Sequence, residues 1–498
     1  MQITSTPVIV MFVLYILLML GIGWMGYRAT SNLSDYILGG RSLGAFVVAL
    51  AAGASDMSGW LLMGLPGAVF LSGVSEAWIA IGLIIGAYLN WRFVAARLRV
   101  YTERSGNALT LPDFFSNRFN DKGNLLRIVS AIVILVFFTL YCASGVVAGA
   151  RLFESMFGMP YTMALWVGAF CTIAYVFIGG FLAVSWTDTI QASLMFAALV
   201  LAPIMVVAAT GGWTPSVEAV AAVDPAHLDM FGDMTTIGII SLLAWGLGYF
   251  GQPHILVRFM AAESLHTIPN ARRISMTWMI LCLAGAVAVG FFGISYFSVH
   301  PEQAAGVNAN SERVFIELSL ILFNPWIAGA LLAAILAAVM STLSAQLLVC
   351  SSSLTQDVYK TFLRPYASQR ELVWFGRAMV LGVALVAIWL ALDPESRVLG
   401  MVSYAWAGFG AAFGPVVILS LIWPRMTRNG AMAGMIVGAA TVLIWKQYGW
   451  LGLYEIVPGF ALGMLAIYVV SLADRAPDAS IRKVFDEVDA EMKTTQVR

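Results

Sequence analysis

Apolar residues fill most of the chain in runs of about 20, with short polar segments between them. A helix of that length crosses roughly 30 Å of hydrocarbon and satisfies its own backbone hydrogen bonds. The pattern therefore predicts an all-α polytopic membrane protein with about thirteen transmembrane helices. Their centres lie in residues 8–27, 43–71, 75–96, 127–150, 162–181, 189–210, 236–261, 275–297, 325–350, 373–392, 400–422, 430–449 and 454–473.

Composition agrees with this class. The chain is 60% hydrophobic and 11% charged, with a mean hydropathy of +0.86, whereas soluble domains carry roughly 25% charged residues. The first run has no basic segment before it and no small-residue cleavage signature after it. We therefore expect it to be a retained helix rather than a secretory signal.

Basic residues predict the orientation. With the N-terminus outside, the inner loops and helix ends collect 23 of the 27 Lys and Arg residues, which leaves outside only Arg151, Arg313, Arg397 and Lys446. Cytoplasmic loops are enriched in these residues, so the N-terminus is expected outside and the C-terminus inside. Formal net charge is zero, and nothing in this distribution suggests a nucleic-acid partner.

No residue constellation typical of an enzyme is visible. The four cysteines lie in apolar runs without CxxC spacing, and the four histidines form no ligand cluster. Buried thiols are the expected state of the cysteines. A channel is also disfavoured, because the chain shows internal pseudo-symmetry rather than oligomeric pore repeats. We expect neither enzymatic activity nor a cofactor.

Almost all charge lies in loops or near the ends of the runs, and Asp56, in the middle of the second run, is the exception. A carboxylate at that depth costs at least about 2.5 kcal/mol and is tolerated mainly beside a cavity, a cation or a proton path. The alternative is a structural Asp that bonds to a neighbouring helix. Residues that weaken helices surround it, namely Gly53, Ser55, Ser58, Gly59, Gly64, Pro66 and Gly67. They predict an interrupted helix with free carbonyls, or a closely packed interface.

The seventh run is interrupted in the same way. Pro253 removes a backbone donor, and Gly246, Gly248 and Gly251 loosen the segment before it. Broken helices at corresponding places in two halves indicate an inverted-repeat transporter with its site near the midplane. The interrupted runs are the second and the seventh, so each repeat would hold five helices. Because five is an odd number, the second repeat has to cross the membrane with inverted topology.

Aromatic residues lie close to this second break. Helical spacing places Trp245, Gly248, Tyr249 and Gln252 on one face. The rings could hold a cationic ring substrate, and core packing is the alternative.

The ninth run has a small-residue face with two hydroxyls. Ala338, Ser341 and Thr342 share this face, and neutral oxygens there could bind a hard cation. Hydroxyls in membrane helices usually bond back to a carbonyl of their own helix, which is the competing interpretation.

These segments resemble the sodium/solute symporter family nearly end to end. The resemblance rests on residues 35–42 (DYILGGRS), 54–60 (ASDMSGW), 181–188 (FLAVSWTD), 251–254 (GQPH) and 340–344 (MSTLS). It implies a LeuT-like core of two inverted five-helix repeats, helices 2–6 and 7–11. The repeats would span residues 43–211 and 236–423, with an external loop at 212–235. Residues 1–42 would hold the first helix and a cytoplasmic loop, 424–473 the last two helices, and 474–498 a partly disordered cytoplasmic tail.

The family resemblance also implies the function and its residues. It implies sodium-coupled uptake of L-proline across the bacterial inner membrane by alternating access, with pantothenate, a sugar or a monocarboxylate as alternative cargo. Sodium would be bound by the carbonyls of Ala54, Met57 and Ala338 and the hydroxyls of Ser341 and Thr342, with Asp56 nearby. Proline would contact Ser58, Gly59, Trp60, Tyr141, Trp245, Tyr249 and Pro253.

The resemblance also implies roles in coupling and sodium release for two further residues, Arg41 and Asp188. Both have plain alternatives. Arg41 obeys the positive-inside rule, and Asp188 could cap the N-terminus of the sixth run.

Overall fold

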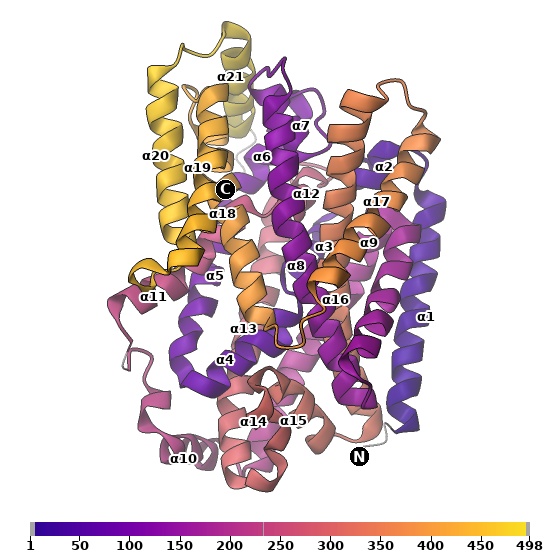
Figure 1. Ribbon diagram of the computed structural model, residues 1–498, viewed down its shortest axis with the longest axis vertical. Coiled ribbons are helices and arrows are strands. Elements are labelled where there is room, and N and C mark those ends of the chain that lie inside the picture. Colours follow the sequence, from indigo (N-terminus) through magenta and orange to yellow (C-terminus); the bar gives the residue numbers. More distant parts are fainter. Residues whose placement is uncertain (1–4, 233, 495–498) are drawn as a thin grey trace.

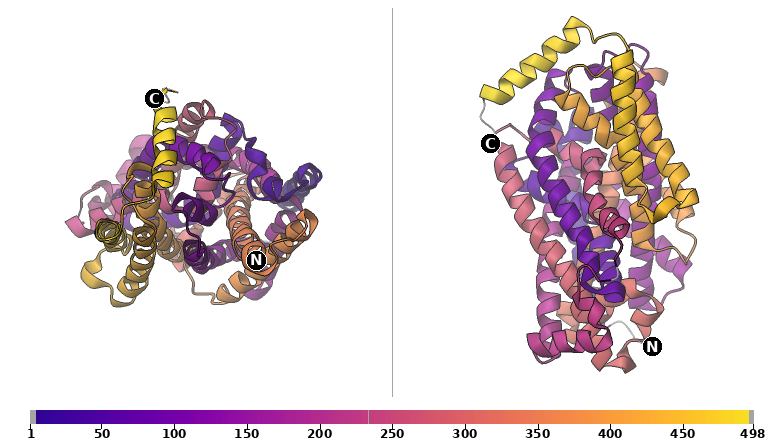
Figure 2. Two further views of the ribbon diagram at one scale, coloured as in Figure 1. Left: turned by 90° about the horizontal axis from the view of Figure 1, so that it is seen from above. Right: turned by 90° about the vertical axis from the view of Figure 1, so that its left-hand side faces the viewer.

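The computed structural model describes residues 5–232 and 234–494, apart from the side chains at positions 175, 178 and 179. Within these residues every element of regular secondary structure is a helix, and the long helices lie side by side along the long axis of the molecule (Figure 1, Figure 2). The helices of twelve or more residues are α1 (Thr6–Ala29), α3 (Ala45–Asp56), α5 (Ala77–Leu89), α8 (Leu125–Phe157), α9 (Tyr161–Ala209), α13 (Thr267–Val299), α16 (Pro325–Ser352), α17 (Gln369–Leu390), α18 (Val398–Ile422), α19 (Arg428–Tyr448), α20 (Ile456–Ala473) and α21 (Ala479–Thr494).

The predicted apolar runs all contain a helix. Ten helices in the described residues are long and apolar enough to cross a membrane, and three shorter apolar helices are Ala45–Asp56, Tyr161–Ala174 and Thr236–Gly251. These segments confirm the all-α polytopic class. The number of crossings and the orientation stay predictions.

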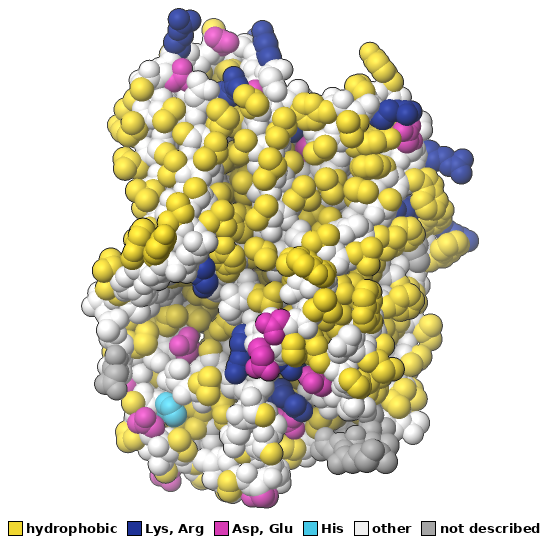
Figure 3. All heavy atoms as spheres, in the orientation of Figure 1, with side chains coloured by type: hydrophobic (Ala, Val, Ile, Leu, Met, Phe, Trp, Pro, Cys, Tyr) yellow, Lys and Arg dark blue, Asp and Glu magenta, His cyan; other side chains and the backbone are white. Residues whose placement is uncertain are grey.

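Charge is distributed unevenly between the two ends of the molecule. The N-terminal end of α1 lies at the bottom of Figure 1, whereas α21 lies at the top. On the face drawn in Figure 3, hydrophobic side chains cover the middle, and Lys and Arg project mainly from the top. This end corresponds to the side that the basic residues predict to be cytoplasmic.

The first interruption separates α3 from α4 (Leu65–Ser72). Helix α3 ends at Asp56, and Met57 leaves the helical region with φ −83° and ψ 83°. A π-helical turn over Trp60–Gly64 then leads into α4. The break turns backbone carbonyls at the end of α3 toward neighbouring helices, as the sequence predicts.

The second interruption separates α11 (Thr236–Leu243) from α12 (Pro253–Met260). Between them Ala244–Gly251 forms a 3₁₀ helix, η6, and Gln252 is extended. Pro253 takes the first position of α12, where a missing N–H costs nothing. The expectation of an α-helical face was wrong here, because a 3₁₀ helix has three residues per turn.

Glycine permits very close packing of η6 against α5. A Cβ built on Gly86 would lie 2.1 Å from the Gly246 carbonyl oxygen, and one on Gly246 would lie 2.2 Å from the Gly82 oxygen. The two backbones therefore touch directly. This contact fixes the position of η6 beside the first interruption.

The structure differs from two of the interpretations given above for helix ends. Asp188 does not cap a helix, because α9 continues through it and its only non-helical residue is Gly180, with φ 64°. The tail was expected to be partly disordered, yet α21 docks on α6 (Ala96–Arg104). Phe485 and Val488 are buried in that contact, and Arg104 pairs with Glu491 at 2.5 Å.

Candidate functional site

The Asp56 carboxyl group lies in the interior, between the two interruptions. Its Oδ2 accepts a short hydrogen bond from the Tyr249 hydroxyl of η6, which links one break to the other. Only 2% of Asp56 is exposed, and its Oδ1 has no hydrogen-bond partner among the described residues. One carboxylate oxygen is therefore available for a ligand.

A cluster of neutral oxygens joins α3 to α16. The Ser341 hydroxyl lies 2.8 Å from the Ala54 carbonyl oxygen and 3.0 Å from that of Ala338, and the Thr342 hydroxyl lies 3.3 Å from the same Ala54 oxygen. Both hydroxyl side chains are buried. Ser341 thus bonds across to α3 as well as back to its own helix, so the competing interpretation accounts for only part of its contacts. The cluster presents the neutral oxygens that a hard cation prefers.

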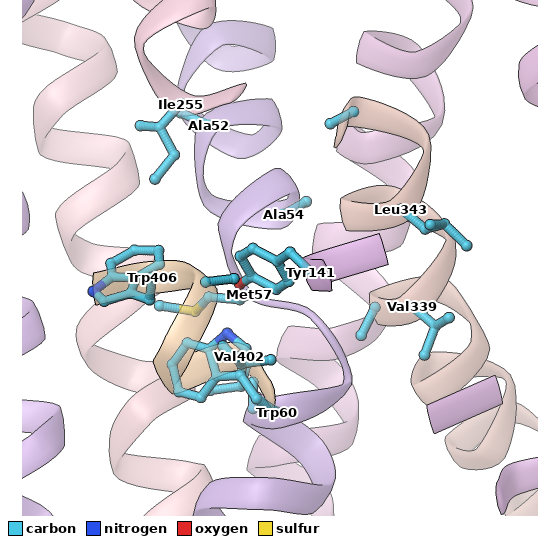
Figure 4. Packing of buried hydrophobic residues seen from close by; sticks show 14 of the residues in the cluster. Ala52, Ala54, Met57, Trp60, Tyr141, Ile255, Val339, Leu343, Val402 and Trp406 are labelled. Atoms are coloured by element: carbon cyan, nitrogen blue, oxygen red, sulfur yellow. The ribbon is translucent and has the colours of Figure 1, made fainter. Parts of the chain in front are cut away.

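The carboxylate and the neutral cluster lie on different sides of α3. Residues 54 and 56 are about 200° apart around a helix. Figure 4 shows Ala52, four residues before Asp56, on the side of Ile255, whereas Ala54 points toward Leu343 of α16. No hydrogen bond in the described part of the chain links the Asp56 side chain to Ser341 or Thr342. The structure therefore assembles two oxygen groups where the sequence suggested one.

Aromatic side chains surround the first interruption. The indole N–H of Trp60 donates to the Asp56 carbonyl at 3.2 Å, and the Tyr141 hydroxyl donates to the same oxygen at 3.4 Å. The Trp60 and Trp245 ring centroids are 6.4 Å apart, and Tyr141 lies beside Met57 in Figure 4. Residues predicted to contact a substrate thus come together from α8, the α3 break and η6.

The remaining predicted contacts fall at the edges of this region. Ser58 and Gly59 form the break itself, and a Cβ on Gly59 would lie 2.7 Å from the Ala148 Cβ. Pro253 is buried at the start of α12. Among the described residues the Met57 carbonyl forms no hydrogen bond with the oxygen cluster, so its predicted role stays a prediction.

Neither predicted coupling residue lies at this site. Asp188 forms a buried ion pair with Arg258 of α12 at 2.9 Å. Arg41 donates to Asn107, to Thr102 and to the carbonyl oxygen of Met260. Burial lowers the pKa of Arg41 to about 10, which leaves it charged near pH 7. Both residues instead tie α12, the continuation of η6, to neighbouring segments.

Sequence reasoning missed two residues that hold η6. Asn90 donates from Nδ2 to the Tyr249 carbonyl at 3.0 Å, and the indole N–H of Trp406 donates to the Trp245 carbonyl at 2.7 Å. The Tyr249 and Trp406 rings meet edge to face at 5.2 Å. A single amide inside an apolar run was the available signal for Asn90. Trp406 gave none, because tryptophan in an apolar run is common.

Comparison with known proteins decides the family. A family model described as the sodium:solute symporter family matches residues 36–438. The chain belongs to the sodium:solute symporter family.

Relatives within this symporter family cover nearly the whole chain. A sodium/proline symporter of Escherichia coli (strain K12) is 68% identical over 486 residues, which are 98% of this chain and 97% of that one. A high-affinity proline transporter of Bacillus subtilis (strain 168) is 55% identical and covers 94% of this chain and 98% of its own.

A solved structure shows the same fold. A Na⁺-coupled sialic acid symporter in an outward-open state superposes with a TM-score of 0.81 at 18% identity, over 95% of this chain and 99% of that chain. The match confirms the predicted LeuT-like architecture.

Proposed function

We propose that this protein is a secondary active transporter that couples inward movement of Na⁺ to uptake of L-proline. The observation that carries the proposal is 68% identity to a sodium/proline symporter over 98% of the chain. The two facing helix interruptions, with oxygens on one side and aromatic rings on the other, support it independently. Its place would be the inner membrane of a bacterium, and no enzymatic step is needed.

The proposed sodium site is the neutral cluster of Ala54, Ala338, Ser341 and Thr342, completed by the Met57 carbonyl. In the cluster, hydroxyl hydrogens lie between oxygens that would otherwise repel one another. A cation would replace that positive charge and turn the hydroxyl oxygens toward itself. Asp56 would stabilise a positive charge at the end of α3, where the helix dipole is also negative.

The proposed proline site lies beside it, between Trp60, Tyr141, Trp245 and Tyr249, with Ser58, Gly59 and Pro253 at its edge. Proline offers a compact apolar ring with a cationic nitrogen, which aromatic faces attract. Its carboxylate suits a half-helix N-terminus. The Tyr249 hydroxyl donates a hydrogen bond to Asp56. This bond links η6, which would contact proline, to the end of α3, which would contact the cation.

Alternating access would join these two events. Sodium binding raises proline affinity by ordering the break, and proline then raises sodium affinity by the same factor. One inward Na⁺ also couples uptake to the membrane potential, at about 2.3 kcal/mol per 100 mV. Arg41 and Asp188 would set how readily α12 moves at the inner end.

Uptake of labelled proline into proteoliposomes tests the proposal. We expect accumulation under an inward sodium gradient and none when choline replaces sodium. Unlabelled proline should compete, whereas pantothenate, sugars and monocarboxylates should not. Sodium-driven uptake of one of those solutes, with no uptake of proline, would reassign the cargo.

A further inference from the structure

A small cavity lies on the Asp56 side of α3. Its polar lining residues are Asp56, Asn90, Tyr249 and Ser275, and the other walls come from apolar residues such as Ile255. The cavity has room for about one ion or one water molecule. It is separate from the neutral cluster, because none of Ala54, Ser341 and Thr342 lines it.

Two of the residues that line this cavity carry an unpartnered oxygen. Asp56 Oδ1 and Asn90 Oδ1 are both buried, and neither has a hydrogen-bond partner among the described residues. A buried polar atom without a partner costs about 1 to 3 kcal/mol, and more when it is charged. Two such atoms among the residues that line one cavity indicate that a bound ligand provides the missing partner for both oxygens.

The charge around the cavity favours a cation. Among the described residues, Asp56 is the only carboxylate that lines it, and no lysine, arginine or histidine lines it. Asp56 is also the last residue of α3, where the helix dipole places partial negative charge. An amide oxygen and a carboxylate oxygen are ligands suited to a small hard cation.

Asn90 holds the cavity together while leaving this oxygen free. Its Nδ2 donates to the Tyr249 carbonyl at 3.0 Å, which fixes the direction of its Oδ1. The Tyr249 hydroxyl in turn occupies Asp56 Oδ2. The same three residues thus orient both free oxygens and connect them to η6.

From this geometry we propose a second cation position, distinct from the neutral cluster, with Asp56 Oδ1 and Asn90 Oδ1 as its ligands. This position binds Na⁺ or Li⁺. It rests on the proposed function and deepens it, because it provides the coupling ion with a second binding position on the other side of α3. Because Asn90 donates to the Tyr249 carbonyl of η6, an ion bound to Asn90 acts directly on the segment that carries Trp245 and Tyr249. Asn90 is accordingly a cation ligand and not solely a structural tie.

The test measures sodium-dependent thermal stabilisation of the purified full-length protein without proline, with choline chloride keeping the ionic strength constant. In Asn90→Ala we expect the sodium concentration for half-maximal stabilisation to rise about tenfold or more. Asn90→Asp keeps the oxygen and loses the donor to Tyr249, so we expect it to retain or increase sodium affinity. A purely structural tie requires both variants to weaken sodium binding alike, and that result would overturn the inference.

A variant of the neutral cluster provides the complementary arm. Ser341→Ala combined with Thr342→Ala should keep a weaker sodium response, and adding Asn90→Ala should remove it. Loss of the whole response in the double variant, with wild-type behaviour of both Asn90 variants, would also overturn the inference. Gln252→Ala is the matched control. This buried amide also donates to a carbonyl, that of Trp406, but lies outside the cavity, so its sodium response should equal that of the wild type.

Uptake by the wild-type protein separates this inference from the proposed function. If the wild type transports no proline yet shows a sodium response that depends on Asn90, the cargo proposal fails and the cation position stands. If the wild type transports proline and the Asn90 variants bind sodium normally, the second cation position alone fails.

Discussion

The hydroxyl of Ser341 provides the sharpest test of the proposed sodium site. Its oxygen lies 2.8 Å from the Ala54 carbonyl oxygen and 3.0 Å from that of Ala338, so it is central to the cluster. Ser341→Ala deletes this oxygen and changes no apolar contact. The same helix offers a matched control, because the buried Ser344 hydroxyl donates to the Ser341 carbonyl at 2.8 Å and has no other hydrogen-bond partner in the described part of the chain.

The expected magnitude follows from the charge of the ligand. A polar contact with a charged partner contributes about 1.5 to 3 kcal/mol, whereas a neutral interhelical hydrogen bond in a membrane contributes about 0.6 kcal/mol. Ser341→Ala should therefore raise the sodium concentration for half-maximal uptake by roughly 10- to 150-fold. Ser344→Ala should change it by no more than about threefold.

The assay is initial-rate uptake of labelled proline into proteoliposomes across a range of sodium concentrations. At saturating sodium, the proline KM of Ser341→Ala should approach that of the wild type, because the ring site is intact. Equal and small effects of the two serine variants would refute a cation site at Ser341. A change in proline KM alone would place the cation elsewhere.

Other parts of the molecule give four further predictions. Asp56→Asn should nearly abolish sodium-driven uptake while the protein still inserts, and wild-type uptake at ordinary sodium would contradict this role. Trp245→Ala should weaken proline binding by about 1 to 3 kcal/mol, as measured by proline-protected labelling. The same variant should keep its thermal stabilisation by sodium in the absence of proline. Asp188→Asn leaves Arg258 buried without its carboxylate and should cost about 3 to 5 kcal/mol, seen as a lower midpoint in thermal unfolding. Phe485→Ala should release α21 to limited proteolysis, whereas 0.5 M salt alone should not, because its partly exposed ion pairs contribute little.

The helices and the two interruptions could be read from the sequence. Twenty apolar residues in a row have few other solutions in a membrane, and Pro253 with its neighbouring glycines cannot continue an α-helix. Asp56 was identifiable as a site residue because a deep carboxylate is costly. Each of these inferences depends on a local property of a few residues.

Partners across helices could not be read in the same way. The family resemblance implies that Asp56 lies near Ser341, yet its side chain bonds to Tyr249. Residue 56 points to another side of α3 than residue 54, because the two are about 200° apart around a helix. The 3₁₀ form of η6 was not predictable from its own residue spacing, and the segment packs against α5 and α18, which lie far from it in the sequence. Docking of α21 depends on burial of Phe485 against Tyr101, a contact between residues far apart in the chain.

The glycine contacts of η6 bear on how the molecule can change shape. Backbones that touch at Gly86 and Gly246 leave no side-chain layer that could shear, and Gly251 meets the Phe409 carbonyl of α18 in the same manner, with a Cβ there only 2.2 Å from its oxygen. Sliding of η6 past either neighbour would drive atoms into one another. The segment that carries Trp245 and Tyr249 is therefore no independent flap. When it moves, α5 and α18 have to move with it as one rigid unit. Any opening of the site has to occur at helix interfaces that are packed by side chains rather than by direct backbone contact.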